Sequence, residues 1–527
     1  MKKTLCLLLS AVLLFSCAGC SPAALFKKSI MRPSRLTFAT EQNERYLTTY
    51  TGKTMALGEN ETAITTPDQS RAVLYDKQEK TLRVVTVGSG KSKTVSLGEN
   101  TLIASGTCLT DKTALLSVKT PEEKYELWIY SFKKGDVICR LSTIPKNSYR
   151  AESYGYGLVS RNYASSGTTY AFCYTDDERR TLYSYTEGET EHKQIYQAAE
   201  DVVVLPASIS DNGRSVMWIE YDKNAEVIDM MFVDCRIMMN YKGKTTEIAS
   251  LTKATTTLFP FSTADGELVV FTKEKKLYQI RKGKLTVSDF DYQQERDFLY
   301  DGAFYSEEGP LNEQQKPGDH LYFHSEAGIW HFDKKGNGTK LLDNVTVCNI
   351  RGGSILYLQN GTVVRAAKLK GAALKKEYTL KENDNGYRID ATLWTLLYRL
   401  SDNGAYCYYR ESGKLYGYKI GAKEPCLIDE NGGVCSISAD GRTVVYESKI
   451  ERDGQKITQL KQCRYGSKKP VVIAENAYSW LTGNSRDTVT GDFLYLVNTD
   501  DTYKTFNVYR WNGHKGTVIF ENVKAEQ

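Results

Sequence analysis

The stretch that decides the fold is "SISADGRTVVYES", Ser436 to Ser448, and a close copy, "SISDNGRSVMWIE", lies at Ser208 to Glu220. Each copy places a polar turn with Asp-Gly or Asn-Gly before a short run of β-forming residues that contains an aromatic one. Asp-Gly and Asn-Gly tolerate the positive φ that tight hairpins need, and strand-forming residues on either side favour a pair of strands. Both copies therefore predict a β-hairpin.

The same turn signature recurs along the whole chain. Successive turns are separated by 34 residues (Gly318 to Gly352) to 56 residues (Asp111 to Gly167). Many units continue with a strand such as "KLYGYKI", a turn with Lys or Gly, and a strand such as "KPVVIAEN". Three or four short strands per unit, with no helical segment between units, are typical of one β-propeller blade. The turns begin at Pro67, Thr110, Ser166, Asp211, Asp265, Gly318, Gly352, Asp402, Asp440 and Gly491.

The sequence thus predicts an all-β protein, a β-propeller of three- to four-stranded antiparallel blades over residues 38–527. Ten turns in one ring would be unusual, since propellers typically have four to eight blades. We expect one ring of about eight blades, with up to ten blades or two smaller rings as alternatives. The segment "YRIDATLWTLLYRL", Tyr387 to Leu400, breaks the pattern, so residues 384–400 are a possible seam.

The pattern Ser-x-Ser-x-Asp-Gly-Arg, followed by a tyrosine at Tyr446, resembles the repeats of the periplasmic Tol-Pal propeller protein. It also resembles the N-terminal propellers of prolyl-oligopeptidase and dipeptidyl-peptidase enzymes. The resemblance extends loosely over residues 65–527 and implies the fold rather than an activity. In those enzymes a catalytic α/β-hydrolase domain follows the propeller, whereas this sequence contains no Gly-x-Ser-x-Gly elbow. No catalytic motif is found, and we expect the protein not to be an enzyme.

The first residues predict an exported, lipid-anchored protein. Lys2 and Lys3 precede a short apolar run, which is typical of a signal peptide over residues 1–19. The small residues before Cys20 resemble a bacterial lipobox, which implies an acyl chain on Cys20; Cys17 is the rival position. Residues 20–37 then form a lipidated tether, which places the protein at the cell membrane on its extracytoplasmic face. The tether's basic residues could rest on anionic headgroups, or simply belong to a soluble linker: Lys27, Lys28, Arg32 and Arg35.

The remaining cysteines do not form a metal or redox motif. None belongs to a Cys-x-x-Cys pair, and most lie in apolar strand patterns, so we expect them to be buried free thiols. They are Cys108, Cys139, Cys173, Cys235, Cys348, Cys407, Cys426, Cys435 and Cys463. We predict no cofactor.

Charge excludes one class of partner. The chain has a formal net charge of +5, and its basic residues are spread along the sequence among acidic ones. This argues against a nucleic-acid groove. We expect the partners to be the membrane, through the N-terminal lipid, and a protein, peptide or glycan ligand.

One cluster of residues is a weak candidate for a metal site. His320 and His324 share one face of a predicted strand, and a hairpin loop over residues 325–328 would place His331 opposite Tyr322 on that face. Three imidazoles can hold zinc or copper, but no carboxylate is placed as a general base. The alternative is that these are ordinary residues of an aromatic-rich hairpin, and we predict no metal.

The leading hypothesis for function is a membrane-anchored, non-enzymatic propeller that acts as a scaffold or sensor by binding a protein, peptide or glycan. The alternative is a glycan lyase or hydrolase with its site in the propeller funnel, which needs converging carboxylates. We also expect the N-terminal segment Arg35 to Tyr50 to pair with the C-terminal blade, around Gly491 to Asn522, and so to close the ring.

Overall fold

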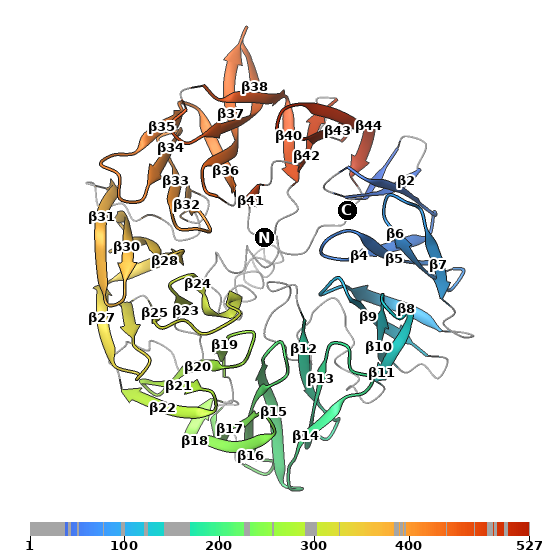
Figure 1. The fold of residues 1–527 in the computed structure, drawn as a ribbon, viewed down its shortest axis with the longest axis vertical. Coiled ribbons are helices and arrows are strands. Elements are labelled where there is room, and N and C mark those ends of the chain that lie inside the picture. Colours follow the sequence, from blue (N-terminus) through green and yellow to red (C-terminus); the bar gives the residue numbers. More distant parts are fainter. Residues whose placement is uncertain are drawn as a thin grey trace, which may run out of the picture.

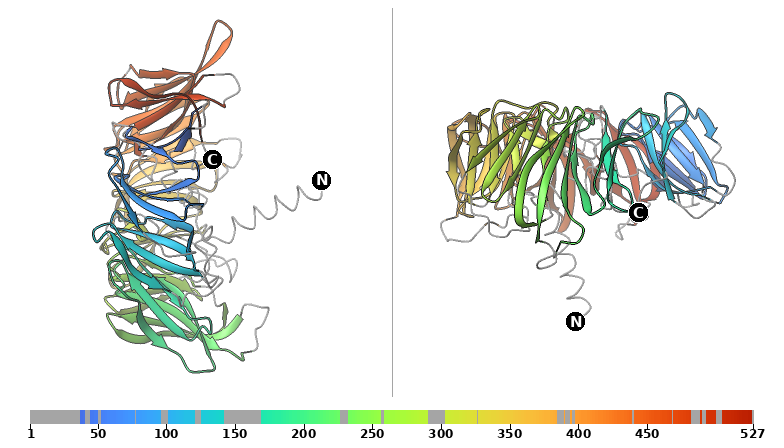
Figure 2. Two further views of the ribbon diagram at one scale, coloured as in Figure 1. Left: turned by 90° about the vertical axis from the view of Figure 1, so that its right-hand side faces the viewer. Right: turned by 90° about the horizontal axis from the view of Figure 1, so that it is seen from below.

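The computed structural model is an all-β, ten-bladed β-propeller whose sheets surround a central axis (Figure 1). Seen from the side, the blades form a flat disc (Figure 2). The structure describes residues 37–525 except for the following gaps: 41–43, 50–51, 77, 96–100, 121–124, 142–168, 226–231, 256–257, 290–302, 326, 384–388, 390–393, 395–396, 439, 468, 482–487, 490–492 and 500–503.

The single ring and the antiparallel blades confirm the predicted fold; the preferred number of eight blades is too low, and the alternative of ten is confirmed. Each of the ten turn signatures corresponds to its own sheet, so ten turns mean ten blades. The number eight came from the usual size of propellers, and the spacing of the turns alone would have given ten. Two of the ten signature turns, at Ser166 and Gly491, lie outside the described residues.

In each blade the strands follow one another from the axis outward, and we call them inner, second, third and outer; the three described strands of blade 3 are its second, third and outer strands. Blades 1 and 2 consist of β4 (Glu61–Thr65), β5 (Arg71–Asp76), β6 (Thr81–Thr86), β7 (Ser92–Val95), β8 (Leu102–Thr107), β9 (Thr113–Lys119), β10 (Tyr125–Ser131) and β11 (Asp136–Leu141). Blades 3 and 4 consist of β12 (Ala171–Thr175), β13 (Thr181–Thr186), β14 (Lys193–Gln197), β15 (Val202–Ile209), β16 (Ser215–Asp222), β17 (Phe232–Tyr241) and β18 (Lys244–Thr255).

Blades 5 to 7 follow the same order, and blade 6 has an insertion toward the axis. They consist of β19 (Phe261–Ser262), β20 (Leu268–Lys273), β21 (Lys276–Arg281), β22 (Lys284–Asp289), β23 (Ala303–Ser306), β25 (Leu321–Ser325), β26 (Gly328–Phe332), β27 (Gly338–Asp343), β28 (Val345–Arg351), β29 (Ser354–Gln359), β30 (Val363–Lys370) and β31 (Ala373–Glu382). The insertion is β24 (Gly309–Pro310) and the 3-10 helix η2 (Leu311–Glu313).

Blades 8 to 10 complete the ring. They consist of β32 (Tyr398–Leu400), β33 (Tyr406–Glu411), β34 (Lys414–Lys419), β35 (Cys426–Asp429), β36 (Gly432–Ser438), β37 (Thr443–Arg452), β38 (Gln455–Arg464), β39 (Val471–Glu475), β40 (Ala477–Leu481), β42 (Phe493–Asn498), β43 (Phe506–Trp511) and β44 (Gly516–Ala525), with β41 (Thr488–Val489) paired in parallel beside β36. The N-terminal strands β1 (Thr37–Ala39), β2 (Arg45–Thr48) and β3 (Thr54–Leu57) join the sheet of blade 10.

The hydrophobic core lies between neighbouring blades rather than inside any one of them. In the opening motif, Val444 packs with Tyr408 of blade 8, while the next residue, Val445, packs with Phe493 of blade 10. Successive side chains of a strand point to opposite faces, so both faces of this sheet are buried. This explains why the second strands read as continuous apolar runs such as "TVVY".

The ring closes through the two ends of the chain. Near its end β44 passes through Asn522, which has a positive φ of 51°. The residues after it pair with β1, with Phe38 opposite Ala525 and Ala39 opposite Lys524. β1, β2 and β3 extend the sheet of blade 10 to seven strands. Phe38 of β1 packs on blade 10, whereas Leu47 of β2 and Leu57 of β3 pack on blade 1, so the three strands fill the space between these two blades. The predicted pairing of the N-terminal segment with the C-terminal blade is confirmed.

Other sequence predictions concern residues that the structure describes only in part. The predicted signal peptide, Cys17, Cys20 and the tether up to residue 36 lie outside the described residues. Within the described part of the possible seam, Trp394 and Tyr398 are buried in a cluster shared by blades 7 and 8. Eight of the nine remaining cysteines are described as free thiols, and all but Cys426 are buried. The described residues include no helix that meets the length and hydropathy needed to span a membrane.

Candidate functional site

The antiparallel order gives the disc two different faces. The turns from inner to second strand and from third to outer strand lie on one side, which we call the repeat face because the repeated motif forms turns there. The turns from second to third strand and the links between blades lie on the other side, which we call the link face.

The repeated motif forms a self-contained turn on the repeat face. In blade 9 the Ser438 hydroxyl donates to Asp440 Oδ1 at 2.6 Å, and the Arg442 backbone N–H donates to the same oxygen at 3.0 Å. The Thr443 N–H donates to Ser438 Oγ at 2.9 Å. Blades 1, 4, 5 and 8 have the same three bonds at equivalent residues. The Ser or Thr two residues before the acid or amide is therefore as much a part of the motif as the glycine.

Where the motif contains asparagine, it also joins one blade to the next. Asn212 Nδ2 donates to the backbone carbonyl of Asp265 at 3.0 Å, from blade 4 to blade 5. Asn403 Nδ2 donates to the carbonyl of Asp440 at 2.8 Å, from blade 8 to blade 9. The polar residues that recur most regularly in the sequence therefore fix the turns and, at these two junctions, join neighbouring blades.

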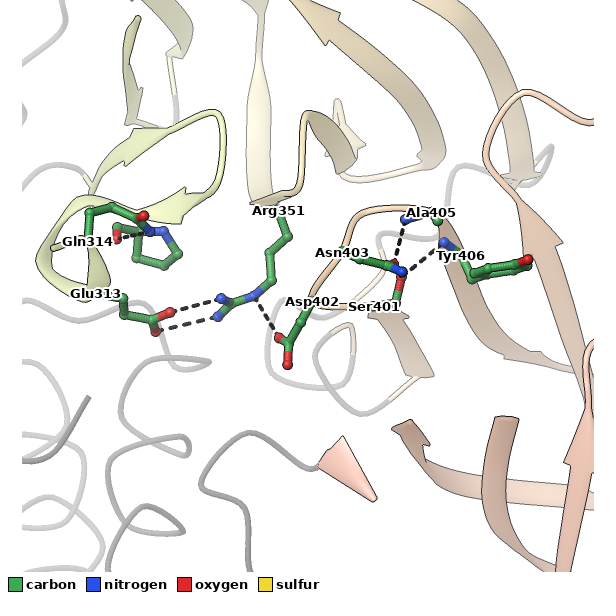
Figure 3. Close-up of polar contacts among 9 residues, drawn as sticks. Glu313, Gln314, Arg351, Ser401, Asp402, Asn403, Ala405 and Tyr406 are labelled. Carbon is green, nitrogen blue, oxygen red and sulfur yellow. Dashed lines mark hydrogen bonds and ion pairs between the residues drawn. The ribbon is translucent and has the colours of Figure 1, made fainter. Parts of the chain in front are cut away.

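The most buried charged cluster also joins blades at the repeat face (Figure 3). The Arg351 guanidinium, whose side chain is 2% exposed, donates to Glu313 Oε2 at 2.8 Å and to its other oxygen at 3.4 Å. Asp402 of blade 8 lies 3.7 Å from Arg351 Nε. One arginine from blade 7 therefore bridges the insertion of blade 6 and the turn of blade 8. Opposite charges compensate each other here, so we assign the cluster a structural role.

The three histidines come together only in part. Tyr322 lies directly opposite His331, as the hairpin prediction requires, and His320 Nδ1 is 2.8 Å from His331 Nε2. His324 instead lies in the interface with blade 7, where its Nε2 is 2.8 Å from the Val345 carbonyl oxygen. Among the described residues, no group of three His, Cys, Asp or Glu side chains is placed to hold a metal ion.

Burial determines the protonation of two of these histidines. It lowers the pKa of His324 from 6.5 to about 4. Burial, and to a smaller extent the adjacent His320, also lowers the pKa of His331. Asp319, which the sequence places beside the histidines, is paired with Lys334 at 2.8 Å. The arrangement is a packed interface between blades 6 and 7.

The outer rim of the repeat face has a feature that sequence reasoning missed. The turn from third to outer strand, or a strand residue directly beside it, has at least one exposed lysine in every blade. In blade 7 this is Lys370, at the end of β30, and in blade 3 it is Lys193, which follows a turn with three glutamates. Examples are Lys133, Lys244, Lys284 and Lys335, in blades 2, 4, 5 and 6. The signal was visible as the recurring "KKG" and "KGK" turns, but the basic residues looked scattered because they gather only when the blades are placed in a ring.

Comparisons with known proteins find distant structural similarities. No protein-family model and no curated protein sequence matches the chain. Among solved structures, a eukaryotic initiation factor is similar over 93% of this chain and 96% of its own, with 7% identity and a TM-score of 0.37. A prolyl endopeptidase is similar over 84% of this chain and 57% of its own (9% identity, TM-score 0.28). An oligogalacturonate lyase from Vibrio parahaemolyticus is similar over 74% of this chain and 95% of its own (11% identity, TM-score 0.25).

Proposed function

We propose that the protein is a membrane-anchored extracytoplasmic lipoprotein whose propeller binds a protein, peptide or glycan without transforming it. The observation that supports this most directly is that the polar motifs of the chain form hydrogen bonds and ion pairs within the fold. The repeated turns, the Arg351 cluster and His324 bond to one another or to backbone, and they make the disc rigid. A rigid disc with variable exposed loops is suited to recognition.

The anchor is tested by labelling cells with a radioactive fatty acid. We expect the wild-type chain and the Cys17→Ala variant to take up label, and the Cys20→Ala variant to stay unlabelled and unprocessed. Loss of label in Cys17→Ala, with normal labelling of Cys20→Ala, would move the anchor to Cys17. Absence of label from the wild-type chain would overturn the lipoprotein assignment.

The binding role is tested by incubating the purified protein with arrays of peptides and of envelope glycans. We expect saturable binding to one class, and mass spectrometry should recover the bound ligand with its mass unchanged. Heat-denatured protein is the control and should not bind. A ligand recovered in cleaved or eliminated form would contradict the proposal and favour a catalytic site in the funnel.

A further inference from the structure

We propose that His320 and His331 form a binding site for a divalent transition-metal ion, and that Cu²⁺ is the ion that fits best. The site lies at the repeat face of blade 6, where this blade meets blade 7, and His324 is not part of it. The inference goes beyond the proposed binding of a protein, peptide or glycan. Three features support it: the distance between the two imidazole rings, a carboxylate beside them, and the exposure of one side of the pair.

The register of blade 6 brings the two rings together. His331 lies opposite Tyr322, and His320 is two residues before Tyr322, so the histidines are diagonal neighbours on one face of β25 and β26. His320 Nδ1 is 2.8 Å from His331 Nε2. At this distance one nitrogen donates a hydrogen bond and the other accepts it, so a lone pair is directed at the neighbouring ring. A metal ion can replace the shared proton and bind both nitrogens.

The distance between the nitrogens favours one coordination geometry. Two nitrogens that are each about 2 Å from an ion lie about 2.8 Å apart when they form a right angle at the ion, and about 3.3 Å apart when the angle is tetrahedral. The observed 2.8 Å matches the right angle. Square-planar or tetragonal sites with nitrogen and oxygen ligands are typical of Cu²⁺ and Ni²⁺, and Cu²⁺ binds more tightly of the two. Each ring must rotate to direct its lone pair at the ion, but the nitrogens need not move apart.

A carboxylate lies on the other side of the His320 ring. Glu307 Oε1 is 3.9 Å from His320 Nε2, the nitrogen that does not face His331. A carboxylate in this place fixes the tautomer of a metal-binding histidine and raises the basicity of the nitrogen that binds the ion. The fold holds Glu307 there, because its Oε1 accepts from the Tyr322 hydroxyl at 3.4 Å and its backbone carbonyl accepts from the Gly353 N–H of blade 7 at 2.8 Å.

The pair is accessible from one side. The side chains of His320 and Glu307 are 35% and 37% exposed, whereas His331 is buried. Burial, and to a smaller extent His320, lowers the pKa of His331, so at neutral pH this ring is uncharged, as a metal ligand must be. Among the described residues no third His, Cys, Asp or Glu side chain completes the set, so water occupies the remaining positions around the ion.

The test titrates Cu²⁺ into the purified protein, prepared without an affinity tag, and follows binding by calorimetry. Electron paramagnetic resonance of the complex reports the ligands. We expect one saturable site with a tetragonal spectrum that is split by two imidazole nitrogens. His320→Gln and His331→Gln should each remove this site, and Glu307→Gln should weaken it about tenfold, which is the effect typical of losing such a supporting carboxylate.

A matched variant controls for the number of histidines. His514→Gln removes an exposed histidine from blade 10 and should bind Cu²⁺ like the wild type. Circular dichroism should show the variants folded, and His320→Gln, at a partly exposed position, tests the site even where His331→Gln does not fold. Absence of saturable binding to the wild type, or an unchanged site and spectrum in His320→Gln, would overturn the proposal. The measurement involves no peptide or glycan, so its outcome is separate from that of the proposed function.

Discussion

At the scale of single residues, one atom decides whether the acid or amide side chain of the motif can donate a hydrogen bond to the next blade. Asp440 and Asn403 accept the same bonds within their turns, but only the asparagine has an amide N–H left to donate across the gap between blades. The turn itself is readable from sequence, because its partners lie within five residues. The acceptor of Asn403 is 37 residues further on, and only the ring brings it close.

The buried histidine makes stability depend on pH. His324 is neutral in the fold because burial lowers its pKa to about 4, whereas the unfolded chain titrates near 6.5. The unfolded state therefore binds more protons between these values. Stability is fully present above pH 6.5 and falls as the pH decreases toward 4, by on the order of 3 kcal/mol in total. Urea denaturation across this range measures the effect.

The control is His324→Gln, which keeps an N–H donor for the Val345 carbonyl but does not titrate. Its stability should change less between pH 6.5 and pH 4 than that of the wild type. An identical pH profile for the two proteins would show that other groups are responsible for the acid sensitivity.

At the scale of strands, aromatic pairs hold the second and third strands of several blades together. Tyr409 and Tyr416 are directly opposite in blade 8, with ring centroids 5.3 Å apart, and Tyr495 and Tyr509 repeat the arrangement in blade 10 at 5.2 Å. The sequence predicted such hairpins, including the Tyr322–His331 register. It could not predict where His324 lies, because that depends on the neighbouring blade.

Removing one ring from such a pair should destabilise the protein strongly. Tyr409→Ala deletes a side chain that is 3% exposed and leaves a cavity, so we expect the free energy of unfolding to decrease by about 3–5 kcal/mol. Tyr409→Phe retains the stacked ring and should cost much less. Chemical denaturation of the two variants is the measurement, and equal losses would mean that the hydroxyl rather than the ring matters.

At the scale of the whole molecule, the sequence predicted a single propeller and its method of closure but not its number of blades. Ten turns were counted correctly, and the usual size of propellers led to the lower number. The gathering of lysines beside the third-to-outer turns was also hidden, because each blade contributes only a few of them and no local run is strongly basic. The gathering of lysines arises only when ten blades are arranged in a ring, so the sequence of any one blade gives little indication of it.

Closure gives a prediction about the C-terminal end. Val523 is fully buried beside Phe38, and residues 524 and 525 pair with β1. A chain that stops at Asn522 should lose the sheet connection between blade 10 and β1, and we expect a lower melting temperature and faster proteolysis of residues 37–57. The matched variant Val518→Thr, at a residue 42% exposed on the same strand, should melt like the wild type. An unchanged melting temperature for the shortened chain would contradict this role.

The pairing of β1 with the end of β44 has a consequence for how the protein folds during its synthesis. Ribosomes make β1 before the other described strands, yet its partner, residues 524 and 525, is made after all of them. During synthesis β1 must therefore wait, with one edge unpaired, until the strands of all ten blades have been made. A cell that makes this protein would benefit from a holding chaperone at that stage, and a prematurely terminated product would be recognisable to proteases by its open edge.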